Sequence, residues 1–156
     1  MESLDIVIEQ VTKGNYHMFD DMVYWRSNGF ERTEEEKEKN KNLNFQDAFL
    51  ELEHQGFYVF AALCEGRFVG WIMLVYIPKI GKWSKGVVFV EELWTDPEFR
   101  RKGIAMKLME KAYEVQRETE AIKVRLYTDN IHAQKLYEKC GLEVTSRAVF
   151  MESKDS

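Results

Sequence analysis

Runs of apolar residues divide the chain into predicted strands and helices. Two long runs, at 57–64 and 68–77, are rich in β-branched and aromatic residues and flank a Glu-Gly-Arg turn, which predicts an antiparallel pair of strands. Because both runs are almost continuously apolar, we expect burial on both faces. A third run at 87–95 ends at Asp96 and Pro97 and predicts another strand. Shorter predicted strands lie at 6–8, 123–128 and 142–151.

Helical spacing separates these runs. The clearest helix is predicted from Ile104 to about Glu120, where apolar residues recur every three or four positions and Lys and Glu fill the other face. Another is predicted to begin at Asn130 and to end at Gly141. Other helical segments are predicted after Thr12, after Asn44 and, as a solvated helix or loop, in the charged run 31–42.

The order of these elements predicts an α+β fold, a sandwich of a sheet and helices. We expect a central mixed, mostly antiparallel sheet of about six to seven strands flanked by about four helices. Neither a repeat nor a linker interrupts the sequence, and 156 residues are the usual size of one domain. The sequence therefore predicts a single domain over 1–156.

Composition and net charge indicate a folded protein whose partners are cationic molecules and not nucleic acids. With 45% hydrophobic residues and two prolines, the chain can bury a sizeable core, which excludes a wholly disordered or collagen-like protein. The 27 acidic residues outnumber the 22 basic ones, and the net charge of −5 lacks the basic surface that nucleic-acid binding requires. Cationic partners are favoured instead.

No targeting signal is predicted. The first ten residues are acidic and lack the basic and apolar regions of a signal peptide. The Glu-Gly-Arg turn splits the apolar segment 57–77 into pieces too short to span a bilayer. Cys64 and Cys140 lack the dense spacing of a disulfide scaffold, so we predict reduced core thiols and a cytoplasmic protein.

The segment from Val90 to Met106 carries the most specific chemical signal. A buried strand passes there into a loop and then into a helix N-terminus, whose backbone N–H groups lack intrahelical partners. Such an N-terminus stabilises phosphate groups, and Gly103 allows close approach to the backbone. The spacing is not that of a nucleotide P-loop. This predicted anion site consists of Arg100, Arg101, Lys102, Gly103, Ile104 and Ala105.

A second motif runs from Asn130 through Ala133 and Tyr137 to Gly141. Alone, Tyr137 would be interpreted as a core tyrosine with a hydrogen-bonded hydroxyl, and Arg-x-x-Gly-x-Ala as an ordinary basic helix start. Together the two motifs resemble the GNAT superfamily of N-acetyltransferases. That family marks its pyrophosphate loop with Arg or Gln, two residues, Gly, one residue, and then Gly or Ala.

The resemblance covers about residues 57–150. Arg100, Gly103 and Ala105 fit the loop pattern, although Ala105 replaces the commoner glycine. Leu142 stands where the family often has phenylalanine. The segment before this region matches in its pattern alone, which is where families of this kind vary their acceptor site.

The resemblance implies acetyl-coenzyme A as acetyl donor, in a cleft where the fourth and fifth strands separate. Residues 100–106 would hold the pyrophosphate through backbone N–H groups, residues 93–95 would bind the pantetheine arm, and Asn130 would contact that arm from the far side. The implied cofactor-binding residues are Leu93, Trp94, Thr95, Arg100, Arg101, Lys102, Gly103, Ile104, Ala105, Met106, Asn130 and Ala133.

Acetyl transfer to an amine needs two proton transfers. The amine, with a reference pKa of about 10, must lose a proton before it attacks the thioester. Glu91 and Glu92 are the candidate bases, and because side chains alternate along a strand, only one can face the acceptor. We favour Glu91, because its spacing to Arg100 resembles that of polyamine-acetylating members of the family. Both could instead be edge or salt-bridged residues. Tyr137 resembles the family's general acid, which protonates the departing thiolate.

The sequence thus predicts an acetyl-CoA-dependent N-acetyltransferase that acts on a primary amine of a small cationic molecule or peptide. We expect the acceptor to meet residues 16–55 and the loop around Trp83. The acidic residues Asp20, Asp21, Glu51 and Glu53 favour a cationic acceptor such as a polyamine, an aminoglycoside or a lysine side chain.

Two other interpretations remain open at this point. One is a non-catalytic acyl-CoA-binding sensor module, and the other is a phosphate-binding structural domain that prefers nucleotides. The three histidines show no metal-ligand spacing, so no metal site is predicted. The resemblance suggests a homodimer, and neither nucleic acid nor a membrane is expected as a partner.

Overall fold

The computed structural model describes residues 5–81 and 85–155. The chain divides into two compact units, 1–126 and 127–156. The elements of the first unit are β1 (Val7–Gln10), α1 (Tyr16–Asn28), α2 (Glu34–Lys41), α3 (Gln46–Leu50), β2 (Phe57–Cys64), β3 (Arg67–Ile77), β4 (Val87–Thr95), the 3-10 turn η1 (Pro97–Phe99), α4 (Ile104–Thr119) and β5 (Lys123–Arg125). The second unit contains α5 (Ile131–Lys139).

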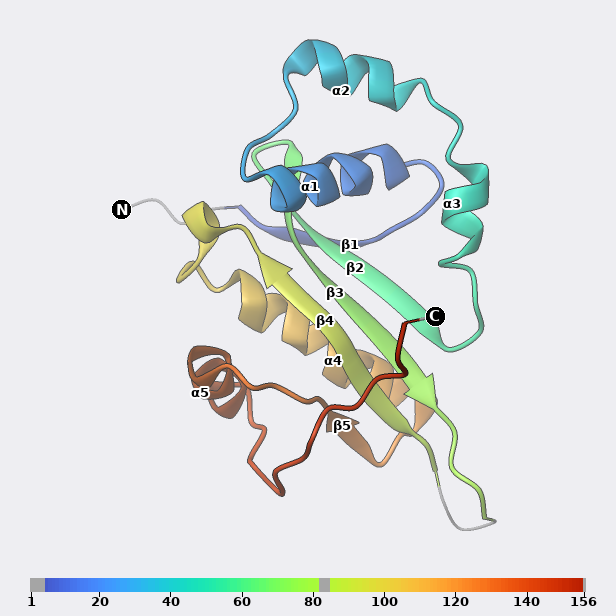
Figure 1. Cartoon of the computed structure of the whole chain (residues 1–156), viewed down its shortest axis with the longest axis vertical. Helices are drawn as coiled ribbons and strands as arrows, with labels where there is room; N and C mark the ends of the chain where they lie inside the picture. Colours follow the sequence, from blue (N-terminus) through green and yellow to red (C-terminus); the bar gives the residue numbers. More distant parts are fainter. Residues whose placement is uncertain (1–4, 82–84, 156) are drawn as a thin grey trace. The chain divides into compact units, whose positions relative to one another are not determined.

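The sheet of the first unit has the strand order β1-β2-β3-β4-β5. Neighbours from β1 to β4 are antiparallel, and β5 pairs with β4 in parallel. The mixed, mostly antiparallel sheet flanked by helices confirms the predicted α+β fold (Figure 1). Both predicted hairpin strands are largely buried, as expected from their continuous apolar runs.

The number of elements differs from the prediction. Among the described residues the sheet has five strands instead of six to seven, and there are five α-helices instead of four. The predicted strand 142–151 has no regular secondary structure. Its apolar pattern suits a strand, but a strand also requires a ladder partner, which local sequence does not specify. The strand predicted at 123–128 is shortened to β5 for the same reason.

The additional helix is α2, in the charged run 31–42. A capping box begins it: the Thr33 side chain accepts a hydrogen bond from the Glu36 N–H, and the Glu36 carboxylate accepts one from the Thr33 N–H. Such reciprocal caps satisfy backbone donors that a helix start leaves open. The run is therefore a helix without an apolar face, and Asn40 is its buried residue.

Two helices cover opposite faces of the sheet (Figure 1). On one face, Phe19 and Met22 of α1 pack against Trp71 of β3 in an apolar cluster. On the other, α4 buries a stripe at helical spacing, which includes Ile104 and Leu108. Within the described ranges, no helix combines the length and apolar composition needed to cross a bilayer.

Candidate active site

A β-bulge lies at the two predicted candidate bases. Met73 of β3 pairs with Glu92, but the next residue, Leu74, pairs with Val90, so Glu91 is an extra residue on β4. A bulge of this kind interrupts the regular alternation of side chains. Simple alternation therefore does not relate the two glutamates here. Register, not alternation, places Glu92 opposite Met73, while Glu91 is exposed.

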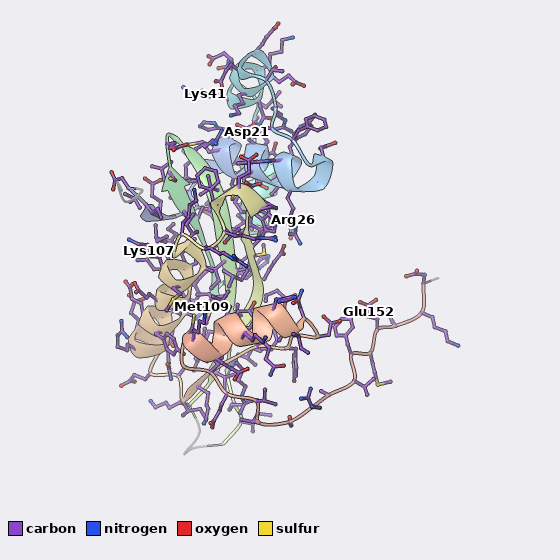
Figure 2. The ribbon with its side chains drawn as sticks, turned by 90° about the vertical axis from the view of Figure 1, so that its left-hand side faces the viewer. Asp21, Arg26, Lys41, Lys107, Met109 and Glu152 are labelled. Carbon is purple, nitrogen blue, oxygen red and sulfur yellow. The ribbon has the colours of Figure 1, made fainter. Side chains whose placement is uncertain are left out.

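Glu92 is held by a cation from α1. Its carboxylate forms an ion pair with the guanidinium of Arg26, which also lies 5.0 Å from the centre of the Trp71 ring. Figure 2 shows Arg26 between α1 and the strands of the sheet. The carboxylate of Glu91 has no ion-pair partner in the described part of the chain. The two glutamates thus differ in environment.

The strands β4 and β5 separate beside the bulge. Their ladder consists of three pairs, of which the last is Phe89 with Arg125, whereas β4 continues to Thr95 in its ladder with β3. From Val90 onward, the edge of β4 away from β3 has no strand partner within the described residues. Residues 93–95 thus have no ladder partner on that edge among the described residues, and the buried hydroxyl of Thr95 has no hydrogen-bond partner there.

The loop after β4 is built by local caps. The Asp96 carboxylate accepts a hydrogen bond from the Glu98 N–H (3.0 Å), which starts η1. The Arg100 side chain turns back, and its Nε donates to the carbonyl of Thr95 at 3.2 Å. This hydrogen bond connects the loop to the end of β4. Arg100 therefore stabilises the conformation of the loop and also adds a positive charge to it.

The loop enters α4 through two left-handed residues, Arg101 (φ 64°) and Gly103 (φ 82°). The hydrogen-bond ladder of α4 begins with the Lys107 N–H, which donates to the carbonyl of Gly103 at 3.1 Å. The N–H groups of residues 104–106 precede it and have no acceptor within the helix. Ile104 is buried and anchors this end, whereas Met106 is exposed.

This helix N-terminus fits a phosphate-bearing ligand. Its open N–H groups and the helix dipole favour an anion, and three consecutive basic residues, 100–102, add positive charge. A Cβ built on Gly103 would meet no other atom within 4 Å, so the backbone is open to approach there. The residues predicted from sequence to hold the pyrophosphate are therefore brought together in one turn.

The second unit contains the other predicted site residues, Asn130, Ala133 and Tyr137. The Asn130 side chain caps α5, because its Oδ1 accepts hydrogen bonds from the N–H groups of His132 (2.9 Å) and Ala133 (3.1 Å). Asn130 thus begins this helix, as the sequence predicts. Tyr137 is partly buried, and burial, with a smaller contribution from Cys140, raises the pKa of its phenol above the usual 10.0.

The acidic residues of α1 have hydrogen-bond partners within the protein. Arg32 donates to Asp20 (2.8 Å) and to Asp21 (2.7 Å), and Asn40 of α2 donates to the same two carboxylates at 3.1 and 2.9 Å. Figure 2 shows Asp21 on the side of α1 toward α2. These carboxylates bind α2 to α1, which weakens their predicted role of attracting a cationic acceptor.

The other predicted acceptor residues divide into exposed and undescribed ones. Glu51 and Glu53 are exposed, and the loop around Trp83 lies outside the described residues.

Sequence reasoning missed Arg26, although a signal exists: Phe19, Met22 and Arg26 follow one another at helical spacing on α1. In the described part of the chain, no group of three or more His, Cys, Asp or Glu side chains is arranged to hold a metal ion.

A mixed sheet whose β4–β5 ladder ends at Phe89, together with a helix start that has open N–H groups, is typical of an acyltransferase-type α+β domain. The model of the Acetyltransferase (GNAT) family matches residues 19–142, and the chain belongs to that family. A search among curated protein sequences finds no significant match.

Solved structures with the same fold include several acetyltransferases. A Trypanosoma brucei acetyltransferase is 18% identical, with a TM-score of 0.70, over 96% of this chain and 100% of that one. The aminoglycoside N-acetyltransferase AAC(6')-Iy in complex with CoA is 18% identical, with a TM-score of 0.74, over 99% and 98%. An aminoglycoside acetyltransferase from an uncultured soil metagenomic sample, in complex with sisomicin, is 19% identical, with a TM-score of 0.73, over 97% of each chain.

Proposed function

We propose that the protein transfers the acetyl group of acetyl-CoA to a primary amine of a small cationic molecule or peptide. The observation that carries this proposal is the turn 100–106, where open backbone N–H groups, basic side chains and an unobstructed glycine coincide beside the free edge of β4. Family membership supports the acetyl chemistry. Aminoglycoside acetyltransferases of the same fold support an amine as acceptor.

The acetyl donor would be held along β4 and the start of α4. Its diphosphate would accept hydrogen bonds from backbone N–H groups of 100–106, with charge supplied by Arg101 and Lys102. Backbone groups of 93–95 would bind the pantetheine arm, and Asn130 and Ala133 would contribute from α5. When bound, the donor supplies a thioester carbonyl that an amine can attack directly.

Glu91 is the favoured proton acceptor. Before the amine attacks, its nitrogen must give up a proton, which a carboxylate takes directly or through water. Glu92 is engaged by Arg26, while the exposed Glu91 has no such partner among the described residues. We therefore keep Glu91 as the base and treat Glu92 as its alternative.

Tyr137 is the proposed proton donor. As the new C–N bond forms and the C–S bond breaks, the sulfur leaves as a thiolate and takes a proton. A donor must carry its proton at neutral pH, and the raised pKa of Tyr137 keeps its phenol protonated there.

We further propose that the chain acts as one domain in the cytoplasm and forms a homodimer, as the family resemblance suggests.

Thiol release from acetyl-CoA across a panel of amines tests this function, together with calorimetric titration of CoA and of ATP. We expect CoA to bind more tightly than ATP and at least one amine to accelerate thiol release. Tight CoA binding without acceleration by any amine would instead indicate the sensor module. Tighter binding of ATP would show that the donor assignment is wrong.

A further inference from the structure

The Arg26–Glu92 pair lies beside the proposed base, on the face of the sheet that α1 covers. Trp71 and Trp94 are opposite each other in the β3–β4 ladder, and Met73 and Glu92 form the next described pair on that side. The two indole rings contact each other with centroids 4.9 Å apart. Glu92 therefore stands at the edge of an aromatic surface, one residue from the bulged Glu91.

Arg26 shows what kind of group this surface accepts. Its guanidinium pairs with the Glu92 carboxylate and lies over the Trp71 ring at 5.0 Å. A carboxylate and an aromatic face are the two partners that stabilise an organic cation. The site is thus complementary to a cation, and a side chain of the protein occupies it.

The side chain of Arg26 is held less firmly than that of Arg32, which lies in the segment after α1. The side chain of Arg32 is 19% exposed and bridges two aspartates, whereas that of Arg26 is 45% exposed and pairs with one carboxylate. Exposed single ion pairs contribute little stability, because water solvates both partners when they separate. A ligand cation can therefore take the place of the Arg26 guanidinium.

We propose that Glu92 and Trp71 form a subsite for a second cationic group of the acceptor, and that Arg26 occupies this subsite until the acceptor displaces it. This inference rests on the proposed function and specifies its acceptor as a molecule with two cationic groups. One amine reaches Glu91 for acetylation, and the other binds Glu92. Adjacent glutamates then have separate tasks, which the bulge makes possible by breaking their regular alternation.

Putrescine and butylamine test the subsite, since they share a four-carbon chain and differ by one amine. Each is titrated by calorimetry into the protein saturated with CoA, using the wild type, Arg26→Gln, and the double variant Arg26→Gln with Glu92→Gln. Removal of the internal competitor is expected to tighten putrescine binding about five-fold, by the size of one exposed cation contact. Butylamine binding should change less than about two-fold.

The double variant distinguishes the subsite from a general effect on folding. Without the Glu92 carboxylate, the gain for putrescine should disappear. Arg117→Gln on α4 removes the same charge from an exposed position on the other side of the sheet, and it should leave both affinities unchanged. Equal changes for the two amines, or a gain that survives in the double variant, would overturn the inference. Thiol release from acetyl-CoA, measured separately with the same variants and amines, reports on the proposed function independently.

Discussion

The guanidinium of Arg67 lies 5.5 Å from the centre of the Phe99 ring. The same group lies 5.1 Å from the Trp25 ring and forms an ion pair with Glu31. Arg67 begins β3, Phe99 ends the turn before the predicted pyrophosphate loop, and Trp25 and Glu31 belong to α1 and the segment after it. One side chain thus connects the loop with the region proposed for the acceptor.

Replacement of Arg67 by Met should loosen the loop. The variant loses both cation–aromatic contacts and leaves Glu31 without this partner, so we expect a loss of about 1–3 kcal/mol in unfolding free energy. CoA affinity should fall as well, because Phe99 no longer holds the loop in place. Urea unfolding and calorimetry measure the two effects.

A matched control is Lys111→Met on α4, which removes a cation 5.4 Å from the centre of the Phe60 ring of β2. We expect it to lower stability slightly without a change in CoA affinity. If both variants bind CoA as the wild type does, Arg67 has no positioning role for the loop.

Gly103→Ala should separate backbone strain from ligand binding. Gly103 adopts φ 82°, where an alanine costs about 1 kcal/mol or more. Its Cβ would meet no protein atom, but it would project beside the N–H groups proposed to bind a diphosphate. A loss of one hydrogen bond to a charged group corresponds to about a ten-fold fall in CoA affinity.

Gly66→Ala provides the comparison, since Gly66 has φ 79° and an equally open surrounding. Both alanine variants should lower the melting temperature by similar amounts. Only Gly103→Ala should weaken CoA binding, as measured by calorimetry. A similar loss of affinity in both would attribute the effect to strain instead of the site.

The sequence predicts the elements of the first unit well, because their signals are local. The apolar runs 57–64 and 87–95 coincide with β2 and β4, and the periodic segment from Ile104 coincides with α4. In each case a turn or glycine marks the end of the run. The helix start with open N–H groups at residues 104–106 is predictable for the same reason, since it depends on one short stretch of chain.

Features that depend on a distant partner are not predictable in this way. The bulge at Glu91 exists because Leu74 pairs with Val90, which is a property of two strands together. Arg26 is 66 positions from Glu92 in the sequence, and no periodicity relates the two. The segment 142–151 has the composition of a strand but no ladder partner in the structure.

Asp96→Asn should stabilise the protein at neutral pH. Asp96 is buried, and this burial raises the pKa of its carboxyl above 3.8. The folded state then binds the proton more tightly than the unfolded state, so stability falls as pH rises from about 4 through the raised pKa. Asparagine removes the charge, while its amide oxygen can still accept the hydrogen bond from the Glu98 N–H.

The gain in stability should therefore shrink as the pH falls through the raised pKa, and it should vanish below the unfolded-state pKa of about 4, where the carboxyl is protonated in both states. Urea unfolding over this pH range measures the difference. An Asn variant that is less stable than the wild type at pH 7 would mean that Arg67 compensates fully for the buried charge.

Tyr137→Phe should abolish most of the acetyl transfer without affecting the donor site. Loss of a general acid lowers kcat by about 10²- to 10⁴-fold, while CoA affinity should change little because the ring is retained. Tyr127→Phe, at an exposed tyrosine of the same unit, is the matched control and should retain full activity. Thiol release and calorimetry on both variants distinguish a lost proton donor from a lost binding contact.

The pH dependence gives a second, independent check on Tyr137. Because burial raises its pKa above 10.0, the phenol stays protonated through the neutral range, and the rate should show no ionisation of this group there. The folded state keeps the phenol proton to a higher pH than the unfolded state does. The contribution of Tyr137 to the free energy of unfolding is therefore lost as pH rises above about 10. A basic limb in kcat near neutral pH that vanishes in Tyr137→Phe would contradict this raised pKa and require a different environment for the hydroxyl.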